Sequence, residues 1–530
     1  MASPWQALAL FSPVLGPPGS EALIRNGPLP WWTHPELKLS LWRPLSSLLM
    51  WLDVAAFGRQ SVWLYHLHSA AWYLAVIAAC AVLLRRALPG AIGAGALLLF
   101  AIDGVHWMSV TWLAQRNALV AAAPALLALA AHVRWREEGW RPGLPLSLLG
   151  FVVGLAGGEA ALGVYCYLVA YELCGGWRPG RWLVALAPSA ALAAGHFWLY
   201  RRLGFGARGS GVYLDPLGSP WTFVAALPER LLALSAGQLL TVPADLRPRA
   251  VPLVGGLLAL ALVAVVLGRA WSTLTSAERG GARWLLVGGV LSLVPVAATA
   301  PHNRLLLLPS LGGAVLVAIL VRHGWTARRR WERAVAYGLV LVHVPLALSG
   351  WAVGHYRYAV AGPWAEEVLL ASHLDVVSRR VVLVVAPDFA TTAYAPSVRA
   401  YRERPLPRSW WTLSAAPYDH RLTRTGVDRF ELEVLGGRML TTIYERVFRG
   451  PDPPLRAGTQ VALEGATVTV LEADAVGPRR VAFHFTVPLE DPSLLILEWR
   501  DGRLLPMPLP AIGASRELPR TPGPLTALGF

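Results

Sequence analysis

Charged residues are scarce in this chain of 530 residues, where they make up only 15% of the composition. Because ordinary soluble domains carry about 25% charged residues, a water-soluble protein of this length is excluded, as are a disordered chain, a coiled coil and a collagen-like chain. Cysteine is also rare, with Cys80, Cys166 and Cys174 all in apolar stretches. Their spacing fits neither a disulfide framework nor a metal site, so we expect three small hydrophobic side chains in helices.

Lysine is almost missing, since Lys38 is its single occurrence and arginine supplies the rest of the positive charge. The net charge of +15 and the isoelectric point of about 10.3 would by themselves suggest nucleic acid as a partner. The arginines, however, occur in short clusters between apolar runs, a pattern typical of the cytoplasmic loops of membrane proteins. No basic patch alternates with aromatic residues as in nucleic-acid sites, and we therefore expect no nucleic-acid partner.

Hydrophobic residues make up 55% of the chain, and the mean hydropathy is +0.47. Because a spanning helix needs about 20 apolar residues, the apolar runs predict a mainly α-helical, polytopic membrane bundle of about ten spans. The candidate spans are 62–84, 88–104, 117–134, 143–157, 160–175, 182–200, 250–270, 283–299, 304–322 and 333–352. The short runs 143–157 and 160–175 predict either two brief crossings or one re-entrant hairpin. The run 43–57, interrupted by Asp53, predicts an amphipathic helix at the membrane interface.

The orientation of the spans follows from the distribution of arginine among the loops. One set of loops is rich in arginine and should face the cytoplasm. Its arginines are Arg85, Arg86, Arg134, Arg136, Arg141, Arg178, Arg181, Arg269, Arg279, Arg283, Arg322, Arg328, Arg329, Arg330 and Arg333. The opposite loops, the long loop 201–249 and the chain after residue 352 should lie outside. Residues 1–44 then lie outside too without a secretory signal. Either later helices carry this segment across or, as we favour, a helix upstream of Met1 is missing from this reading frame.

The chain changes character from about residue 360, where short β-branched or alternating segments follow one another between Gly, Pro and Asp turns. They predict a β-rich extracytoplasmic domain. The predicted strands are 381–385, 430–434, 460–463, 467–471, 481–487 and 494–499. The predicted domains are an external N-terminal segment with the interfacial helix (1–60), a transmembrane helical domain (61–355), the β-rich domain (356–515) and a flexible tail (516–530).

Polar residues gather at the external ends of the predicted spans, where their cost near lipid points to function. They are Arg43, Tyr65, His66, His68, Asp103, His106, Arg116, Glu159 and Arg304. Their gathering on one side predicts a single external cavity for a polar or anionic headgroup. The three histidines could instead form a metal or proton-transfer cluster. Since no three ligands stand at a known zinc spacing, we predict no metal and no other cofactor.

Four segments, in order over about residues 40–320, resemble GT-C glycosyltransferases, in particular those of the protein O-mannosyltransferase type. WRPLSSLLMWLDVAAFGRQSVWLYHLHSAAWYLAVIAACAVLLRR is similar to their opening, with an RPL segment, a Tyr-His at a helix start and a basic helix end. FAIDGVHWMSVTWLAQRNALV resembles their next external loop, with Asp103, His106 and Arg116 in the matching places. GLAGGEAAL matches a helix start at Glu159, and HNRLLLLPSLGGA matches an Arg-x-Leu-x-Leu-Pro-Ser-Leu-Gly run at Arg304.

The resemblance implies a multi-pass protein of the inner membrane that transfers a sugar from a polyprenyl-phosphate donor at the periplasmic face. Its expected partners are the lipid-linked donor and membrane lipids. Such a reaction needs a carboxylate that takes the proton of the acceptor and cations that stabilise the leaving phosphate. The candidate catalytic residues are Asp103, Glu159 and Glu21, and the candidate substrate-binding residues are Arg116, Arg304, His106, His66, Arg43, Arg201 and Arg202.

One departure from the family concerns the catalytic acid, which in these enzymes lies in the first external loop. We expect this chain to begin after that point, because Glu21 is its only carboxylate before the Pro-Trp-Trp segment and does not match the paired-acid pattern. Asp103 has the alternative role of orienting His106, and Glu159 that of a partner of a helix dipole. The sequence thus predicts a truncated or inactive glycosyltransferase. The alternatives are a non-catalytic protein that binds a lipid phosphate or scaffolds an envelope complex, and a transporter, for which the internal repeat is missing.

Overall fold

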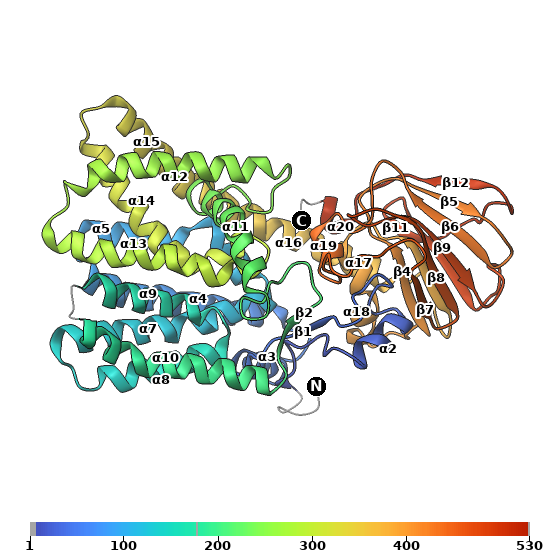
Figure 1. Cartoon of the computed structure of the whole chain (residues 1–530), viewed down its shortest axis with the longest axis horizontal. Coiled ribbons are helices and arrows are strands. Elements are labelled where there is room, and N and C mark those ends of the chain that lie inside the picture. The colour runs from blue at the N-terminus through green and yellow to red at the C-terminus, as the bar shows by residue number, and fades with distance from the viewer. Residues whose placement is uncertain (1–6, 176–178, 528–530) are drawn as a thin grey trace. The chain divides into compact units, whose positions relative to one another are not determined.

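The computed structural model describes residues 7–175 and 179–527 and divides into two compact units (Figure 1). The helical unit comprises Met1–Pro13, Leu41–Gly206 and Asp215–His355. The β-rich unit comprises Val14–Ser40, Ala207–Leu214 and Tyr356–Phe530. Of the arginines assigned to the cytoplasmic loops, Arg178 lies outside the described residues, as do the outermost residues of the predicted N-terminal segment and tail.

The helical unit contains a helix at each of the ten predicted spans. They are α4 (Val62–Ala87), α5 (Ala91–Ile102), α7 (Arg116–Glu138), α8 (Gly143–Gly157), α9 (Ala161–Cys174), α10 (Pro179–Arg202), α12 (Ala250–Trp271), α13 (Ser276–Val296), α14 (Pro309–Thr326) and α15 (Arg330–Leu341), which continues through the π-helical η4 (Val342–Leu346) into α16 (Ala347–Leu370). The predicted helix at the interface is also present, as α3 (Pro44–Phe57). In Figure 1, α4, α7, α9 and α13 run nearly parallel to one another.

Seven of the described helices are long and apolar enough to cross a bilayer, and the chain is a multi-pass membrane protein. Six of the seven coincide with predicted spans, namely α4, α5 with the short α6 (Trp107–Thr111), α7, α10, α12 and α15 with α16. The helices α8 and α9 have 15 and 14 residues, which gives them a length of about 21–23 Å, short of the ~30 Å hydrocarbon core. Because α8 packs mainly on α7 and α9 mainly on α13, the structure favours two separately packed helices over one hairpin.

The seventh helix lies within residues 201–249, which were wrongly predicted to be one long loop. This helix is α11 (Pro220–Leu240). Glu229 and Arg230 lie within its apolar sequence. Arg230 is accommodated because its Nη1 donates to the carbonyl oxygen of Ala297 at 2.7 Å. The helix packs closely on α12 at Gly256, where an added Cβ would lie 2.0 Å from the carbonyl oxygen of Leu232.

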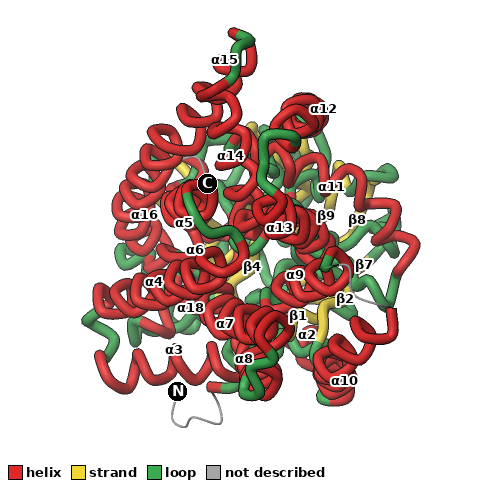
Figure 2. The backbone as a smooth tube through the Cα atoms, turned by 90° about the vertical axis from the view of Figure 1, so that its left-hand side faces the viewer, coloured by secondary structure: helices red, strands yellow, loops and turns green. Residues whose placement is uncertain are grey.

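The alanine-rich α7 is the most buried of the candidate spans. Figure 2 shows it between α4 on one side and α8 on the other. Gly150, Gly154 and Gly157 of α8 face it, and a Cβ added at any of them would come within 3.0 Å of an atom of α7. Small residues at helix contacts allow close backbone packing, which drives association where lipid removes the hydrophobic effect. These contacts bring the backbones of α7 and α8 close together along residues 121–128 of α7.

The β-rich unit contains two larger sheets and one short two-stranded sheet of β1 (Lys38–Ser40) and β2 (Gly206–Arg208). The four-stranded sheet has the order β11 (Arg503–Pro506), β10 (Leu494–Arg500), β3 (Arg380–Val385) and β4 (Ser409–Ser414), with β3 parallel to both of its neighbours. The six-stranded sheet is antiparallel, in the order β12 (Ser515–Leu518), β5 (His420–Arg424), β6 (Arg429–Val434), β9 (Pro478–Phe485), β8 (Ala466–Ala473) and β7 (Gln460–Leu463). The six predicted strands are confirmed, while β4, β5, β11 and β12 were not predicted.

Two boundaries differ from the predicted domains. Residues Val14–Ser40 pack within the β-rich unit: the indole Nε1 of Trp31 donates to the carbonyl oxygen of Leu413 at 2.8 Å, and that of Trp411 donates to the carbonyl oxygen of Arg25 at 3.0 Å. The predicted flexible tail contains β12, which pairs with β5. Both associations join segments far apart in sequence, which local patterns cannot reveal.

Candidate functional site

A series of short turns between α5 and α7 carries three residues that the resemblance singled out, Asp103, His106 and Arg116, together with Trp112. Asp103 caps η1 (Gly104–His106), where its Oδ1 accepts a hydrogen bond from the backbone N–H of Val105 at 3.1 Å. Such a cap satisfies a backbone donor that the start of a helix leaves without a partner. The chain then passes through α6 and η2 (Leu113–Gln115) into α7 at Arg116. As a result, Asp103, His106, Trp112 and Arg116 all lie at the end where α5 stops and α7 starts.

Arg116 is buried at the start of α7, and each nitrogen of its guanidinium donates to the protein. Nε donates to Ser69 Oγ and Nη2 to the carbonyl oxygen of Tyr65, both at 2.8 Å. Nη1 is ion-paired with Asp53 and lies 3.2 Å from His68 Nδ1. His68 Nδ1 in turn lies 2.6 Å from Asp53 Oδ1. This geometry gives Arg116 the task of joining α3, α4 and α7, and it does not favour the phosphate-binding role expected from the sequence.

Asp53 is a buried charged residue of this site that was not among the candidates predicted from the sequence. It lies on α3 and is 4% exposed, although α3 was expected to lie at the interface with Asp53 as its polar interruption. A lone carboxylate in an apolar helix was the available signal, because such a group needs a partner cation when it is buried. The partner could not be named from the sequence, since Arg116 is 63 residues away.

His106 is fully buried and joins three segments. Its Nδ1 lies 2.9 Å from Tyr73 Oη on α4, and its Nε2 lies 2.7 Å from Ser310 Oγ on α14. Both hydroxyls also donate to backbone carbonyl oxygens, Ser310 Oγ to that of Leu307 at 2.8 Å and Tyr73 Oη to that of Ala101 at 3.0 Å. With both ring nitrogens bonded to protein, His106 positions the helices around it.

Asp103 is also buried, at 4% exposure. Besides capping η1, its carboxylate is hydrogen-bonded by the side chain of Gln238 on α11. The backbone oxygen of Asp103 accepts a hydrogen bond from the indole of Trp351 at 3.0 Å. These contacts agree with the alternative role of Asp103, because the turn that it caps is the one that presents His106.

Arg43 and Glu159 form an ion pair that is more accessible than the groups above. Arg43 Nε donates to Glu159 Oε2 at 2.8 Å, and the two side chains are 18% and 29% exposed. The guanidinium of Arg43 also lies over the ring of Phe11, 4.9 Å from its centroid, which is a favourable cation–π distance. Glu159 precedes α9 by two residues, so its charge also faces the positive end of that helix dipole.

Two buried oxygen atoms beside this pair have no hydrogen-bond partner among the described residues. They are Oε1 of Glu159 and Oδ1 of Asn117, which follows Arg116 on α7. Gly158 lies between the two side chains: a Cβ added there would be 3.1 Å from Asn117 Nδ2 and 3.6 Å from Arg43 Nε. Because buried polar atoms are normally bonded to protein, water or a ligand, this is the place in the cluster where a polar ligand could be received.

Arg304 brings a second cation from the segment that precedes α14. It lies on η3 (Asn303–Leu306), half-buried, with its guanidinium 4.9 Å from the ring centroid of Trp112. His302, before it, accepts a hydrogen bond from the backbone N–H of Arg304 through Nδ1 at 3.1 Å. Burial, together with the charge of Arg304, lowers the pKa of His302 to about 4, so this imidazole is neutral at pH 7. We call Arg43, Asp53, Asp103, His106, Arg116, Glu159 and Arg304 the polar rim.

Three other candidates form no hydrogen bond or ion pair with the polar rim in the described chain, and the fourth, Glu21, belongs to the other unit. Arg201 is paired with Asp215 at 2.8 Å in a half-exposed surface contact. Arg202 lies over the ring of Trp198 on the outside of α10. His66 is exposed on the first turn of α4. Glu21 belongs to the β-rich unit, exposed on the first turn of α2 (Gly19–Asn26).

A metal centre has no support in the part of the chain that the structure describes. No group of three or more His, Cys, Asp or Glu side chains there could hold a metal ion. The alternative cluster of His66, His68 and His106 is not assembled either, because His68 pairs with Asp53 and His106 with Tyr73 and Ser310.

Comparisons with known proteins give little further information. No protein-family model and no curated protein matches the chain. Among solved structures, it is similar to ArnT from Cupriavidus metallidurans in a crystal structure with bound undecaprenyl phosphate. The two share 14% identity over 91% of this chain and 95% of that chain, with a TM-score of 0.37. A likeness this low carries no argument about function.

Proposed function

We propose that this chain is an integral membrane protein of the GT-C glycosyltransferase type that binds a polyprenyl-phosphate-linked sugar at its extracytoplasmic face. The observation that carries the proposal is the partly exposed pair of Arg43 and Glu159. It combines a cation and a carboxylate, the two groups that sugar transfer from a phosphate carrier requires. The buried members of the polar rim hold the surrounding helices in place.

The two side chains suit different parts of that reaction. Among the hydrogen bonds of described residues, Arg43 donates to Glu159 through Nε, so its two Nη groups are the ones to place on a phosphate, where arginine forms charge-assisted bonds. Oε1 of Glu159, which has no partner in the described chain, would take the proton of the attacking hydroxyl group. Arg304, held over Trp112, would supply a second positive charge on the leaving phosphate.

The proposed side of the membrane follows from where the charges lie along the helices. The ion pair of Arg43 and Glu159 lies at the end where α8 stops and α9 starts, while Arg134, Arg136 and Arg141 lie at the opposite end of α7 and α8. Loops rich in arginine stay in the cytoplasm. The pair then faces the extracytoplasmic side, which in a bacterium is the periplasm.

A second candidate is a non-catalytic protein that binds a lipid phosphate. The observation that favours it is the state of the carboxylates: Asp53 and Asp103 are buried and bonded, and Glu159 is ion-paired with Arg43. A phosphate can be bound by arginine side chains alone, without a free carboxylate. Binding and turnover therefore have to be measured separately.

The test uses the purified full chain in detergent, titrated with undecaprenyl phosphate and followed by native mass spectrometry. We expect Arg43→Gln to weaken binding about ten-fold or more, because it removes a charge-assisted hydrogen bond. Arg201→Gln removes an exposed arginine outside the polar rim and should change nothing. Loss of binding in both variants, or in neither, would contradict the proposed site.

Turnover is then measured with an undecaprenyl-phosphate-linked sugar and extracted membrane acceptors, as release of undecaprenyl phosphate. An active enzyme should lose release in Glu159→Gln while it keeps binding the carrier. Binding without release in the unmodified chain would establish the second candidate and remove the first.

A further inference from the structure

A groove of about 870 Å³ lies between α4 and α8 on the surface of α7. It forms because α4 and α8 both pack on α7 from different sides, as Figure 2 shows. The floor consists of the small side chains of Pro124, Ala128 and Ala131 on α7. Because these three side chains are small, α4 and α8 form the two sides of a shallow channel over this part of α7.

The walls of the groove are apolar and accessible. Leu127, Leu146 and Leu149 line it and are 49%, 45% and 59% exposed. In a helix that spans a membrane, such side chains contact lipid tails rather than water. The groove thus offers an acyl chain contacts from three helices at once, whereas a flat helix face would offer contacts from one.

Its mouth lies at the arginine-rich end and is basic. Arg85, Arg86, Arg134 and Trp140 line it, together with Glu137. Arg86 and Arg134 are both bound to Glu138, at 2.6 and 2.8 Å, and Arg86 lies 3.4 Å from Glu137. Arg85 is exposed and forms no ion pair with any carboxylate of the described chain. Three arginines therefore face two glutamates, which leaves one positive charge, at Arg85.

The groove also has the length of one leaflet. From Arg134 at the mouth to Pro124 is ten residues of α7, or about 15 Å at 1.5 Å per residue. Half of a hydrocarbon core of ~30 Å is about 15 Å. At the other end α3 contacts α4, α7 and α8, with Ser46 Oγ donating to the carbonyl oxygen of Gly157 at 2.6 Å. The helix α3 thus lies beyond the end of the groove that is opposite to the basic mouth.

We propose that this groove is a binding site for one anionic phospholipid of the leaflet on the arginine-rich side. The phosphate lies at Arg85, Trp140 sits at the headgroup level, and one acyl chain follows Leu127, Leu146 and Leu149 toward α3. Basic pockets between spanning helices on the cytoplasmic side bind anionic headgroups in this way. The site is at the opposite end of α7 from the polar rim, and it does not depend on the proposed sugar transfer.

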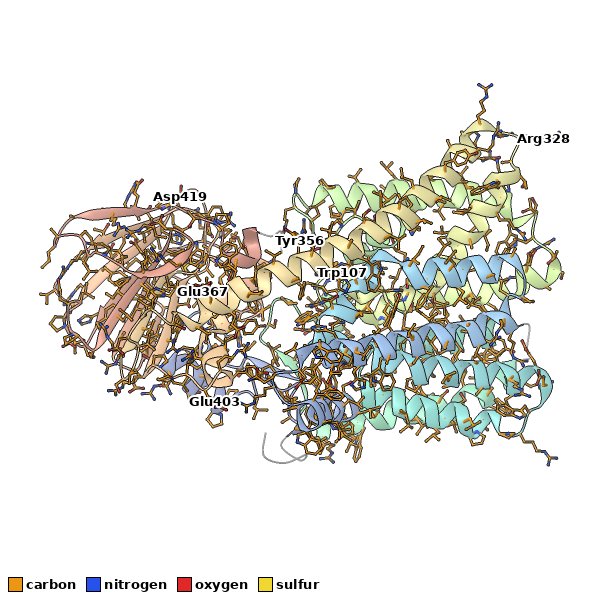
Figure 3. All side chains as sticks on the ribbon, turned by 180° about the vertical axis from the view of Figure 1, so that it is seen from behind. Trp107, Arg328, Tyr356, Glu367, Glu403 and Asp419 are labelled. Atoms are coloured by element: carbon orange, nitrogen blue, oxygen red, sulfur yellow. The ribbon has the colours of Figure 1, made fainter. Side chains whose placement is uncertain are left out.

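The test compares two lipids with identical acyl chains, dioleoylphosphatidylglycerol and dioleoylphosphatidylcholine, added to the delipidated full chain and measured by native mass spectrometry. We expect phosphatidylglycerol to bind more tightly, and Arg85→Gln to weaken its binding about five-fold, the effect of one arginine near an anionic headgroup. Arg328→Gln is the matched control: it removes an exposed arginine from the turn between α14 and α15, where Figure 3 shows it, outside the groove.

The proposed position of the acyl chain is tested with two variants. Ala131→Leu fills the floor of the groove, and Leu127→Ala removes an exposed side chain that would contact the acyl chain. Both should lower the binding of the two lipids alike. Equal binding of the two lipids with no effect of Arg85→Gln would overturn the headgroup assignment. If Ala131→Leu leaves lipid binding unchanged but abolishes a dimer that the unmodified chain forms in the same spectra, a helix of a second copy occupies the groove instead.

Discussion

The guanidinium of Arg116, at the start of α7, and the carboxylate of Asp53, on α3, form an ion pair in which both side chains are almost completely buried. The pair joins α3 to α7, which is the most buried of the candidate spans. The pair is satisfied on both sides, since Arg116 also bonds to Ser69 and Tyr65 and Asp53 also bonds to His68. The polar rim is therefore built on a fixed base, with Arg43 one residue before α3.

Removal of the charge of Asp53 should destabilise the helical unit. Asp53→Asn leaves the Arg116 guanidinium buried without its counter-ion, which typically costs about 3–5 kcal/mol. We expect a clear drop in the thermal midpoint of the full chain in detergent. Asp215→Asn breaks the exposed pair with Arg201 and should cost less than about 1 kcal/mol. Similar losses in the two variants would mean that burial does not set the strength of the first pair.

Gly158 should be needed for the geometry of Arg43 and Asn117. Its φ of 156° lies where side chains are strained, and a Cβ would lie 3.1 Å from Asn117 Nδ2. We expect Gly158→Ala to destabilise the chain by about 1–3 kcal/mol and to weaken the binding of undecaprenyl phosphate, measured by native mass spectrometry. Gly180→Ala is a suitable control, because nothing lies within 4 Å of the added Cβ. If Gly158→Ala binds undecaprenyl phosphate as tightly as the unmodified chain, the ligand site does not depend on the turn at Gly158.

The packing of α11 on α12 can be tested with two adjacent glycines. A Cβ at Gly256 would lie 2.0 Å from the carbonyl oxygen of Leu232, whereas a Cβ at Gly255 would meet its first neighbour, Leu240 Cδ1, at 3.5 Å. We expect Gly256→Ala to cost about 1–3 kcal/mol through overpacking and Gly255→Ala to be tolerated. Thermal unfolding of both variants in detergent gives the comparison. If Gly255→Ala is the more damaging change, α11 does not pack on α12 as described.

The β-rich unit should lose stability as the pH falls. Burial lowers the pKa of His420 to about 4 from an ordinary value of 6.5, and its Nε2 lies 2.8 Å from Ser414 Oγ. Between these two pH values the unfolded chain binds a proton that the folded chain does not, so the free energy of unfolding falls as the pH drops from 6.5 to 4. The loss amounts to about 3 kcal/mol for this group. Above pH 6.5 the group contributes no pH dependence.

The measurement is the difference in thermal midpoint between pH 7.0 and pH 4.5, taken for the unmodified chain and for His420→Gln. The variant cannot bind the proton, so its midpoint should fall less on acidification. His302, whose pKa is also lowered to about 4, contributes equally to both proteins and cancels in the comparison. An equal fall in the two proteins would show that His420 is not the buried neutral group described here.

The candidate site was predictable in part. The external ends of the apolar runs contained Arg43, Asp103, His106, Arg116, Glu159 and Arg304. The structure pairs Arg43 with Glu159 and places Arg304 over Trp112, which lies in the same series of turns as Asp103, His106 and Arg116. Their individual roles were not predictable. Whether an arginine faces a ligand or a carboxylate depends on which residue lies opposite: Arg116 meets Asp53 on α3, while Arg43 meets Glu159 and remains partly exposed.

The sequence by itself determined the class of the protein. Apolar runs of helical length, arginine clusters at one end and alternating β segments after residue 360 are local patterns, because each depends on the period of one element and on its contact with lipid or core. Only the tertiary structure decided that residues 220–240 form a helix, that Val14–Ser40 join the β-rich unit, and which carboxylate stays accessible. Those outcomes depend on pairs of groups far apart in the sequence, from 67 residues for Arg230 with Ala297 to 382 for Trp31 with Leu413. A buried charge or indole is stable only where such a partner is present.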